Sequence, residues 1–336
     1  PAYYECSKSE FSHNKKYRFG GSRRGPNIVK EKVIAIAGVS TLLGQLFLRK
    51  ITERPSISVA SLHDCLAETG TLDISQSKDL MINSEVLAQF RNVPLLRPSD
   101  SSLAPLLISF LPELGAERCE SKHLSEGTKV ITHCEYARLT ARMVCPNVLP
   151  DPDPQERHLV TPNCTTAICA SPLDSIHKVH GIESATITTL QAISGTDLPG
   201  LHAYQIHDQV ISQIEREACA LTEELGRIFN QAFSIDVFAT RVPVWRGHTI
   251  TVSLTLKQST PIAAIEETLR LTPGVRFDFG GQGRHYRDES DTYADPIATV
   301  TELRQGQHSV LMGLKGDNLG SATVGIMERA LNMLDA

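Results

Sequence analysis

We predict an α/β fold in which a domain built on a parallel sheet precedes an α+β domain. In the first half of the chain, short segments that are apolar on both faces alternate with helical segments, as in buried parallel sheets. A glycine-containing turn at residues 38–44 joins the first strand to the first helix, which is how a Rossmann-type dinucleotide-binding unit begins. After residue 164 the strands become longer and alternating, with long connections, which favours an α+β arrangement.

The elements of the first half follow directly from the apolar segments. An amphipathic helix is expected over 45–51, and the proline-rich stretch 142–158 is expected to be a loop. The predicted buried strands are 32–37, 57–62, 106–111 (ended by Pro112) and 129–133.

The second half shows both periods of secondary structure. Helical spacing of apolar residues predicts helices over 205–230, 262–271 and 322–334. Loops rich in glycine and aspartate are expected at 194–200 and 278–296. The predicted strands are 184–193, 237–244, 248–256 and 309–314.

These elements give three domain boundaries. Residues 1–30 are polar and lack an apolar period, so we expect a disordered or loosely attached arm. Residues 31–163 should form the Rossmann-type domain, completed by a C-terminal helix within 318–336. Residues 164–317 should form the second domain.

Composition narrows the possible functions. The chain has 336 residues, 41% of them hydrophobic, which is enough for two domains. Its net charge of −5 provides no basic field for nucleic acid, and no apolar run approaches the roughly 18 residues of a membrane span. The eight cysteines form no C-x-x-C pair, so neither a metal site nor a disulfide framework is expected. This cysteine usage favours a reducing, cytoplasmic location.

The turn Gly38–Gly44 carries the first functional signal. Glycines let a backbone approach a pyrophosphate, and the following helix N-terminus offers N–H groups. Thr41 stands near the expected place of a middle glycine, so a Rossmann-like fold with a weak or absent nucleotide site is an equal alternative. Asp64 falls where an acidic residue would hold an NAD ribose, although a lone aspartate after a strand is more often a turn residue.

The turn Thr161–Thr166 carries the second signal, because it places Cys164 before a predicted buried helix. A cysteine at a helix N-terminus lies in a positive field that favours the nucleophilic thiolate. A buried structural cysteine is the alternative. His248 and Arg241 could face the same cleft, the histidine as acid and base and the arginine as a carboxylate ligand.

Three motifs together resemble the aspartate-β-semialdehyde dehydrogenase family, and most of all its archaeal and fungal branch. The resemblance covers about residues 31–336 and is strongest in the second half. The motifs, in the order and spacing of that family, are V-T-P-N-C-T-T at 160–166, T-L-Q-A-I-S-G at 189–195 and R-V-P-V-W-R-G-H-T at 241–249.

The resemblance assigns roles to residues around the cysteine. It implies that Cys164 is the nucleophile that forms a thiohemiacetal and then an acyl-enzyme. Asn163 would position the reacting group, Gln191 would orient the substrate, and His248 would act as acid and base.

It also implies substrate contacts. Arg241 matches the arginine that binds the substrate carboxylate, and Arg138 matches a phosphate-binding arginine. The pair Glu215 and Arg216 falls where the family has a Glu–Lys pair for the substrate amine and phosphate. The implied cofactor contacts, for NADP or NAD, are Gly38, Ser40, Thr41, Leu42, Leu43, Ser194, Gly195 and Asn318.

The departures from the family lie on the cofactor side. Thr41 replaces a glycine, and His63–Glu68 replaces a basic, serine-rich loop for the 2′-phosphate. Ser194–Asp197 reads S-G-T-D where the family has S-G-A-G, and the segment after Asn318 is shortened. The cysteine side is retained, so we expect NADP or NAD binding that is altered, weakened or lost.

The resemblance therefore implies an oxidoreductase of amino-acid biosynthesis that acts on an aldehyde or acyl phosphate through a cysteine thioester. Its second domain would carry catalysis and the subunit contact, with a small-molecule substrate and a homodimer or homotetramer as the assembly. Two alternatives stay open: a redox-silent paralogue that uses Cys164 and His248 for acyl transfer or thioester hydrolysis, and a non-catalytic binding protein.

Overall fold

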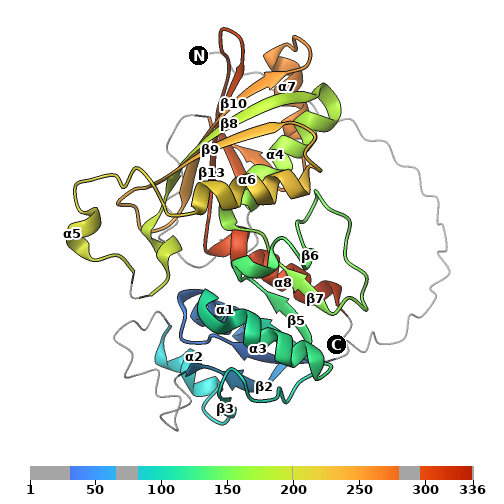
Figure 1. Cartoon of the computed structure of the whole chain (residues 1–336), viewed down its shortest axis with the longest axis vertical. Helices are drawn as coiled ribbons and strands as arrows, with labels where there is room; N and C mark the ends of the chain where they lie inside the picture. The colour runs from blue at the N-terminus through green and yellow to red at the C-terminus, as the bar shows by residue number, and fades with distance from the viewer. Residues whose placement is uncertain (1–30, 66–81, 199, 280–295, 335–336) are drawn as a thin grey trace, which may run out of the picture. The chain divides into compact units, whose positions relative to one another are not determined.

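The computed structural model in Figure 1 describes residues 31–65, 82–198, 200–279 and 296–334. All of the described residues belong to one compact unit. The predicted arm lies outside the described residues, as do residues 66–68 of the expected cofactor loop and most of the expected loop at 278–296.

The first sheet is parallel throughout and is buried on both faces. Its strand order is β3-β2-β1-β4-β5-β7-β6, so the chain reverses its direction of winding between β1 and β4. In such sheets a ligand crevice lies outside the carboxyl ends of the strands at this reversal. The strands are β1 (Lys32–Ala37), β2 (Ile57–His63), β3 (Leu95–Leu96), β4 (Leu106–Ser109), β5 (Lys129–Thr132), β6 (Arg142–Met143) and β7 (His158–Val160).

Helices cover this sheet. Thr41 caps α1 (Leu42–Thr52), because its Oγ1 accepts the Gly44 N–H, so the helix begins three residues earlier than predicted. The chain's last helix, α8 (Gly325–Met333), follows a π turn at Gly320–Val324 and packs near β5, as Figure 1 shows. The other helices are α2 (Ser84–Gln89) and α3 (Glu113–Ser125), neither of which was predicted.

The second sheet is mixed, with strand order β11-β12-β13-β10-β8-β9. Its buried face packs against helices α4 (Cys164–His180), α6 (Glu217–Ile228) and α7 (Ile262–Arg270), which lie beside it in Figure 1. The strands are β8 (Ile182–Gln191), β9 (Ser234–Arg241), β10 (His248–Leu256), β11 (Val275–Phe277), β12 (Ala298–Gln305) and β13 (Val310–Gly316). The predicted α/β fold, with a Rossmann-type sheet and a second α+β region, is confirmed.

The prediction of one helix over 205–230 is wrong. The structure has a short helix α5 (Ala203–Ile206) and then α6, and residues between them run beside the end of β9, where Ile211 pairs with Arg241. Arg216 adopts a left-handed backbone conformation with φ of 59°, which ends the connection and sets the start of α6 at Glu217. Strands β3, β6, β7, β11 and β12 were also missed, and β6 lies within the predicted loop at 142–158.

Candidate active site

Cys164 is the first residue of α4, where β7 passes into that helix through a short turn. Asn163 is the N-cap, and its Oδ1 accepts the Thr165 N–H at 2.8 Å. Pro162 cannot continue the strand, and the cap fixes where the helix begins. The sulfur therefore lies in the positive field of the helix N-terminus, as the sequence predicted.

His248 begins β10 and presents Nε2 to the Cys164 Sγ at 3.3 Å. The Ala192 N–H donates to Nδ1 at 3.0 Å, which makes Nε2 the nitrogen that carries the proton. Burial, with a smaller contribution from Arg241, lowers the pKa of His248 to about 3, so the ring is neutral at pH 7. His248 thus serves the sulfur as a hydrogen-bond donor, whereas the sequence suggested that it takes the thiol proton.

Glu217 links three elements of the site. Its Oε1 accepts hydrogen bonds from Asn163 Nδ2 at 3.1 Å and from Gln191 Nε2 at 2.9 Å. These bonds bring the first residue of α6, the cap of α4 and the end of β8 together. They also place a carboxylate close enough to act on Cys164.

Opposed influences set the acidity of the Cys164 thiol. Burial raises its pKa to about 12, and the Glu217 carboxylate acts in the same direction. Arg138, Arg241 and the helix N-terminus act against them. The resting sulfur is therefore a thiol at neutral pH, and a cationic group bound beside Glu217 would make it more acidic.

Of the three predicted arginines of the substrate site, Arg138 and Arg241 are buried. Arg241, at the end of β9, donates from Nη1 to the Ala192 carbonyl at 2.8 Å, and a side chain at Gly195 would lie 2.8 Å from the same nitrogen. Arg138 lies in a buried ion pair with Glu224 at 3.1 Å and also donates to the His133 carbonyl. Its charge is therefore partly engaged within the protein.

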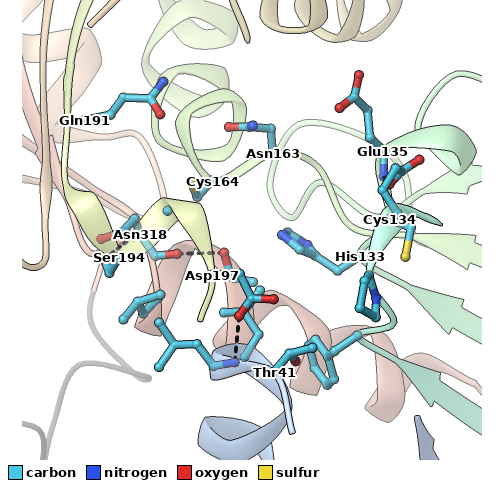
Figure 2. A pocket seen from close by; sticks show the side chains of 18 of the residues that line it. Thr41, His133, Cys134, Glu135, Asn163, Cys164, Gln191, Ser194, Asp197 and Asn318 are labelled. Atoms are coloured by element: carbon cyan, nitrogen blue, oxygen red, sulfur yellow. Dashed lines mark hydrogen bonds between the residues drawn. The ribbon is translucent and has the colours of Figure 1, made fainter. Parts of the chain in front are cut away.

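A pocket of about 310 Å³ connects the cysteine to the carboxyl ends of the parallel strands (Figure 2). Residues after β1, β4 and β5 line one side, and the Cys164 region lines the other. The site residues that line it include Thr41, Leu42, Leu43, Arg138, Asn163, Cys164, Gln191, Ser194, Gly195, Glu217, His248 and Asn318.

The predicted cofactor residues have structural contacts that the sequence did not reveal. Gly38 has φ of 73°, and a Cβ there would lie 2.3 Å from the Phe110 carbonyl oxygen, so the turn requires glycine. Asn318 accepts the Gly247 N–H and donates to Ser194 Oγ. It therefore holds the loop after β8 against the loop that leads to His248.

Carboxylates of the chain itself occupy the turn after β1. The Ser40 N–H and hydroxyl donate to Asp64 at 2.8 and 3.0 Å, and the Leu42 N–H donates to Asp197 Oδ1 at 2.9 Å. Asp64 is only 2% exposed. Its position directly after β2 agrees with the interpretation of Asp64 as a turn residue and not as a ribose ligand.

The structure does not bring Glu215 and Arg216 into the pocket. Both side chains are exposed, and Arg216 lies 3.7 Å from Glu135 in an ion pair. The carboxylate beside the cysteine is Glu217, two residues further on, because the helix begins there. The acidic first turn of an amphipathic helix could have indicated Glu217, whereas nothing in the sequence pointed to Asp197 at α1 or to His133 in the pocket.

Two negative findings apply to the described residues. None of their helices is both long and apolar enough to cross a membrane. No group of histidine, cysteine, aspartate and glutamate side chains among them could hold a metal ion.

Comparisons with known proteins find similar sequences among semialdehyde dehydrogenases. The family model described as "Semialdehyde dehydrogenase, dimerisation domain" matches residues 173–319. An aspartate-semialdehyde dehydrogenase from Archaeoglobus fulgidus is 25% identical over 241 residues, which are 64% of this chain and 69% of that protein. A malonyl CoA reductase (NADP) from Metallosphaera sedula is 22% identical over 275 residues, which are 71% and 74% of the two chains.

Solved structures show the same fold. The aspartate semialdehyde dehydrogenase with NADP from Candida albicans has a TM-score of 0.75 at 19% identity and covers 89% of this chain and 98% of its own. The aspartate semialdehyde dehydrogenase II complexed with ASA from Vibrio cholerae has a TM-score of 0.71 at 18% identity and covers 90% and 98%.

Proposed function

We propose, since the chain belongs to the aspartate-semialdehyde dehydrogenase family, that it is an oxidoreductase that acts on a small aldehyde or acyl phosphate through a thioester at Cys164. The observation that carries the proposal is the sulfur at the N-terminus of α4, 3.3 Å from Nε2 of a neutral histidine. The family relationship favours this function over acyl transfer without redox chemistry and over simple binding.

The charges around the cysteine suggest the substrate class. Glu217 lines the pocket and provides a carboxylate for a substrate ammonium, whereas Arg241 is not among the lining residues and is the guanidinium that the resemblance assigns to a substrate carboxylate. The relatives include enzymes named for aspartate semialdehyde, which carries both groups, and for malonyl CoA, which carries no amine. Glu217 therefore favours an amino-dicarboxylate-like substrate, with an aldehyde or acyl phosphate in place of one carboxylate, whose ammonium would also make the Cys164 thiol more acidic.

The first chemical step requires only residues of this chain. The deprotonated sulfur attacks the carbonyl carbon of an acyl phosphate, the C–S bond forms, and phosphate leaves with the electron pair of the C–O bond. In the tetrahedral intermediate the His248 Nε2–H would donate to the developing charge, and Gln191 and Asn163 would hold the substrate in place. The thiol proton passes to solvent or to the departing phosphate.

NADP is the cofactor that the family implies, and one relative was solved with it. The turn that would hold its pyrophosphate does not accept it in this conformation. The Ser40 and Leu42 N–H groups already donate to Asp64 and Asp197, and two carboxylates there would repel phosphate. We propose NADP or NAD as a cofactor that binds weakly, and we assign no step of the mechanism to it.

Assembly and location are also proposals. The matched dimerisation domain supports an oligomer, and we propose a homodimer, or a homotetramer built from two such dimers, through the half-exposed face of the second sheet that carries Thr188 and Thr251. Most soluble oligomers consist of identical subunits arranged with closed symmetry, and the two-fold dimer is the commonest. A cytoplasmic location is proposed from the scattered cysteines.

The proposed function is tested by acylating the protein. Incubation with an acyl phosphate such as acetyl phosphate should add one acyl group, located at Cys164 by peptide mass spectrometry, and Cys164→Ser should take up none. With L-aspartate semialdehyde, NADP and phosphate, the wild type should reduce NADP and the variant should not. Loss of the sulfur should lower turnover by at least about 10³-fold, because a hydroxyl cannot replace the thiolate.

Cys169→Ser is the matched control, because Cys169 lies on the same helix but is fully buried away from the pocket. It should take up the acyl group at Cys164 as the wild type does. An acyl group found on another cysteine, or turnover that survives in Cys164→Ser, would refute the assignment of the nucleophile.

A further inference from the structure

The Asp197 carboxylate lies at the N-terminus of α1, although 155 residues separate it from Leu42. Leu42 is the first residue of the helix, and its N–H donates to Asp197 Oδ1 at 2.9 Å. Figure 2 shows Asp197 reaching from the loop after β8 down to the turn that carries Thr41. The turn follows a strand of the first sheet, the loop follows a strand of the second, and residues of both line this pocket.

This helix N-terminus is the place where a doubly wound parallel sheet binds the phosphates of a nucleotide. It follows β1 at the reversal of strand order, and its N–H groups and dipole favour an anion. In this chain the anion is a carboxylate of the protein. A pyrophosphate could take the Leu42 N–H only if Asp197 left.

Three further donors of the turn are engaged as well. The Ser40 N–H donates to Asp64, the Thr41 N–H to the Gly38 carbonyl, and the Gly44 N–H to Thr41 Oγ1. Asp64 is 2% exposed and follows β2, the strand next to β1, whereas Asp197 belongs to a loop 155 residues from Leu42. The contact that a ligand can break by moving one loop is therefore the one with Asp197.

The backbone of Asp197 is suited to movement. Its φ of 60° and ψ of −179° lie in a region that glycine occupies and other residues adopt only under strain. The hydrogen bond to Leu42 helps to hold this conformation, and departure of the side chain would let the backbone relax. The neighbouring Ser194 stays fixed by Asn318, so the loop can move at 197 without releasing the Cys164 side of the pocket.

We propose that Asp197 is an internal competitor for the phosphates of the dinucleotide, so that residue 197 sets nucleotide affinity and the nucleotide binds only when this carboxylate leaves α1. The proposal rests on the proposed function for the identity of the ligand. The proposal assigns the weak binding of nucleotide to the Asp197 carboxylate. The altered sequence of the turn did not by itself identify that group.

The test compares Asp197→Asn and Asp197→Gly with the wild type. Binding of NADPH, NADH and inorganic pyrophosphate is measured by isothermal titration calorimetry. Asparagine keeps a hydrogen-bond acceptor but removes the charge, so we expect about tenfold tighter binding of all three ligands. Glycine also removes the acceptor and relieves the strained backbone, so its gain should be at least as large.

Asp208→Asn is the matched control. Asp208 is exposed, also has a positive φ of 55°, and does not line the pocket, so the same charge change there should leave all three affinities unaltered. Thermal denaturation of each variant checks that it folds. If one of the two substitutions at position 197 prevents folding, the other still tests the proposal. Unchanged or weaker binding in both would overturn the proposal.

Acylation of Cys164 in the unchanged protein separates this inference from the proposed function. Acylation with no gain in affinity at position 197 would refute only the internal competitor. Tighter nucleotide binding in the variants without acylation of the wild type would refute only the thioester function.

Discussion

The acidity of one thiol decides the chemistry of the site. Burial and Glu217 raise the pKa of Cys164, whereas two arginines lower it, and the balance leaves a pKa of about 12. Because Glu217 also receives hydrogen bonds from Asn163 and Gln191, it is fixed in place and its field acts in every state of the empty site. A substrate ammonium would neutralise it, so we infer that binding and activation of the nucleophile are coupled.

Glu217→Gln should therefore speed alkylation of Cys164 in the empty enzyme while it weakens turnover. With a thiol pKa near 12, the wild-type rate should rise about tenfold per pH unit between pH 7 and 10. Removing the carboxylate should lower that pKa and increase the iodoacetamide rate at each pH by at least about threefold. The rate is measured by peptide mass spectrometry of Cys164.

The control is Glu223→Gln, an exposed glutamate on the same helix. It should leave the alkylation rate unchanged. A Glu217→Gln rate at or below that of the wild type would show that Glu217 does not govern the sulfur.

At the scale of elements, the approach of α4 to the second sheet sets the distance between sulfur and imidazole. His248 pairs with Gly316 across the antiparallel strands β10 and β13. A Cβ on Gly316 would lie 2.4 Å from Cγ1 of Ile168, one turn after Cys164 on α4. The absence of a side chain at 316 therefore allows the helix to lie at its present depth.

Gly316→Ala should push α4 away from the sheet. We expect a loss of about 1–3 kcal/mol in the free energy of unfolding, measured by urea denaturation, because the added methyl meets packed atoms. The Cys164–His248 distance should lengthen, and the rate of Cys164 acylation should fall by about tenfold or more.

Gly313→Ala tests the same strand on its other face. A Cβ there would meet the Thr301 hydroxyl, at the end of a side chain, at 2.8 Å, so the cost should be smaller and acylation should persist. If the two substitutions lower the free energy of unfolding and the acylation rate equally, Gly316 does not determine how closely α4 approaches the sheet.

The elements that the sequence predicted are those whose burial is visible in a short window. The strands at 32–37 and 129–132 are apolar on both faces. The place of Cys164 at a helix N-terminus could be predicted because a capping residue and a proline precede it. Helix α3 was missed because its buried side is polar: Glu120, which is buried, accepts hydrogen bonds from Ser109 and Thr132. No apolar period marks such a helix.

The predicted helix over 205–230 failed for a different reason. Apolar spacing continues through residues 207–216, but these residues follow the edge of β9 and not a helix axis. The pattern could not show that Arg216 has a left-handed backbone conformation, so that α6 begins only at Glu217. Glu215, which the resemblance assigned to the substrate, lies before this helix.

At the scale of the whole molecule, the site draws on both sheets. Cys164 follows the first sheet, whereas Gln191, Arg241 and His248 stand at the ends of strands of the second. Spacing in the sequence can suggest that such residues cooperate, but only the folded chain shows which groups touch. The hydrogen bond between the Leu42 N–H and Asp197 could be found only in the folded chain, because the two residues belong to separate sequence motifs.

Burial of thiols throughout the fold predicts a loss of stability at alkaline pH. Burial raises the pKa of Cys145, Cys164 and Cys169 to about 12, from an ordinary value of 9.0. Between these values the unfolded chain loses protons that the folded protein retains, so stability falls as pH rises. The stabilisation is complete below pH 9 and is lost progressively towards pH 12. Burial lowers the pKa of Lys315, Arg227 and Arg241, and these groups act in the opposite direction.

The slope of unfolding free energy against pH should therefore be negative above pH 9, by up to about 1.4 kcal/mol per pH unit for each buried thiol. Cys169→Ala removes one of these groups and should make the slope shallower by that amount. Leu173→Ala, also fully buried on α4, should lower stability at every pH without changing the slope, because it removes packing and no titrating group. Urea unfolding between pH 8 and 11 measures all three proteins, and equal slopes for the wild type and Cys169→Ala would show that the buried thiol releases its proton as readily in the folded protein as in the unfolded chain.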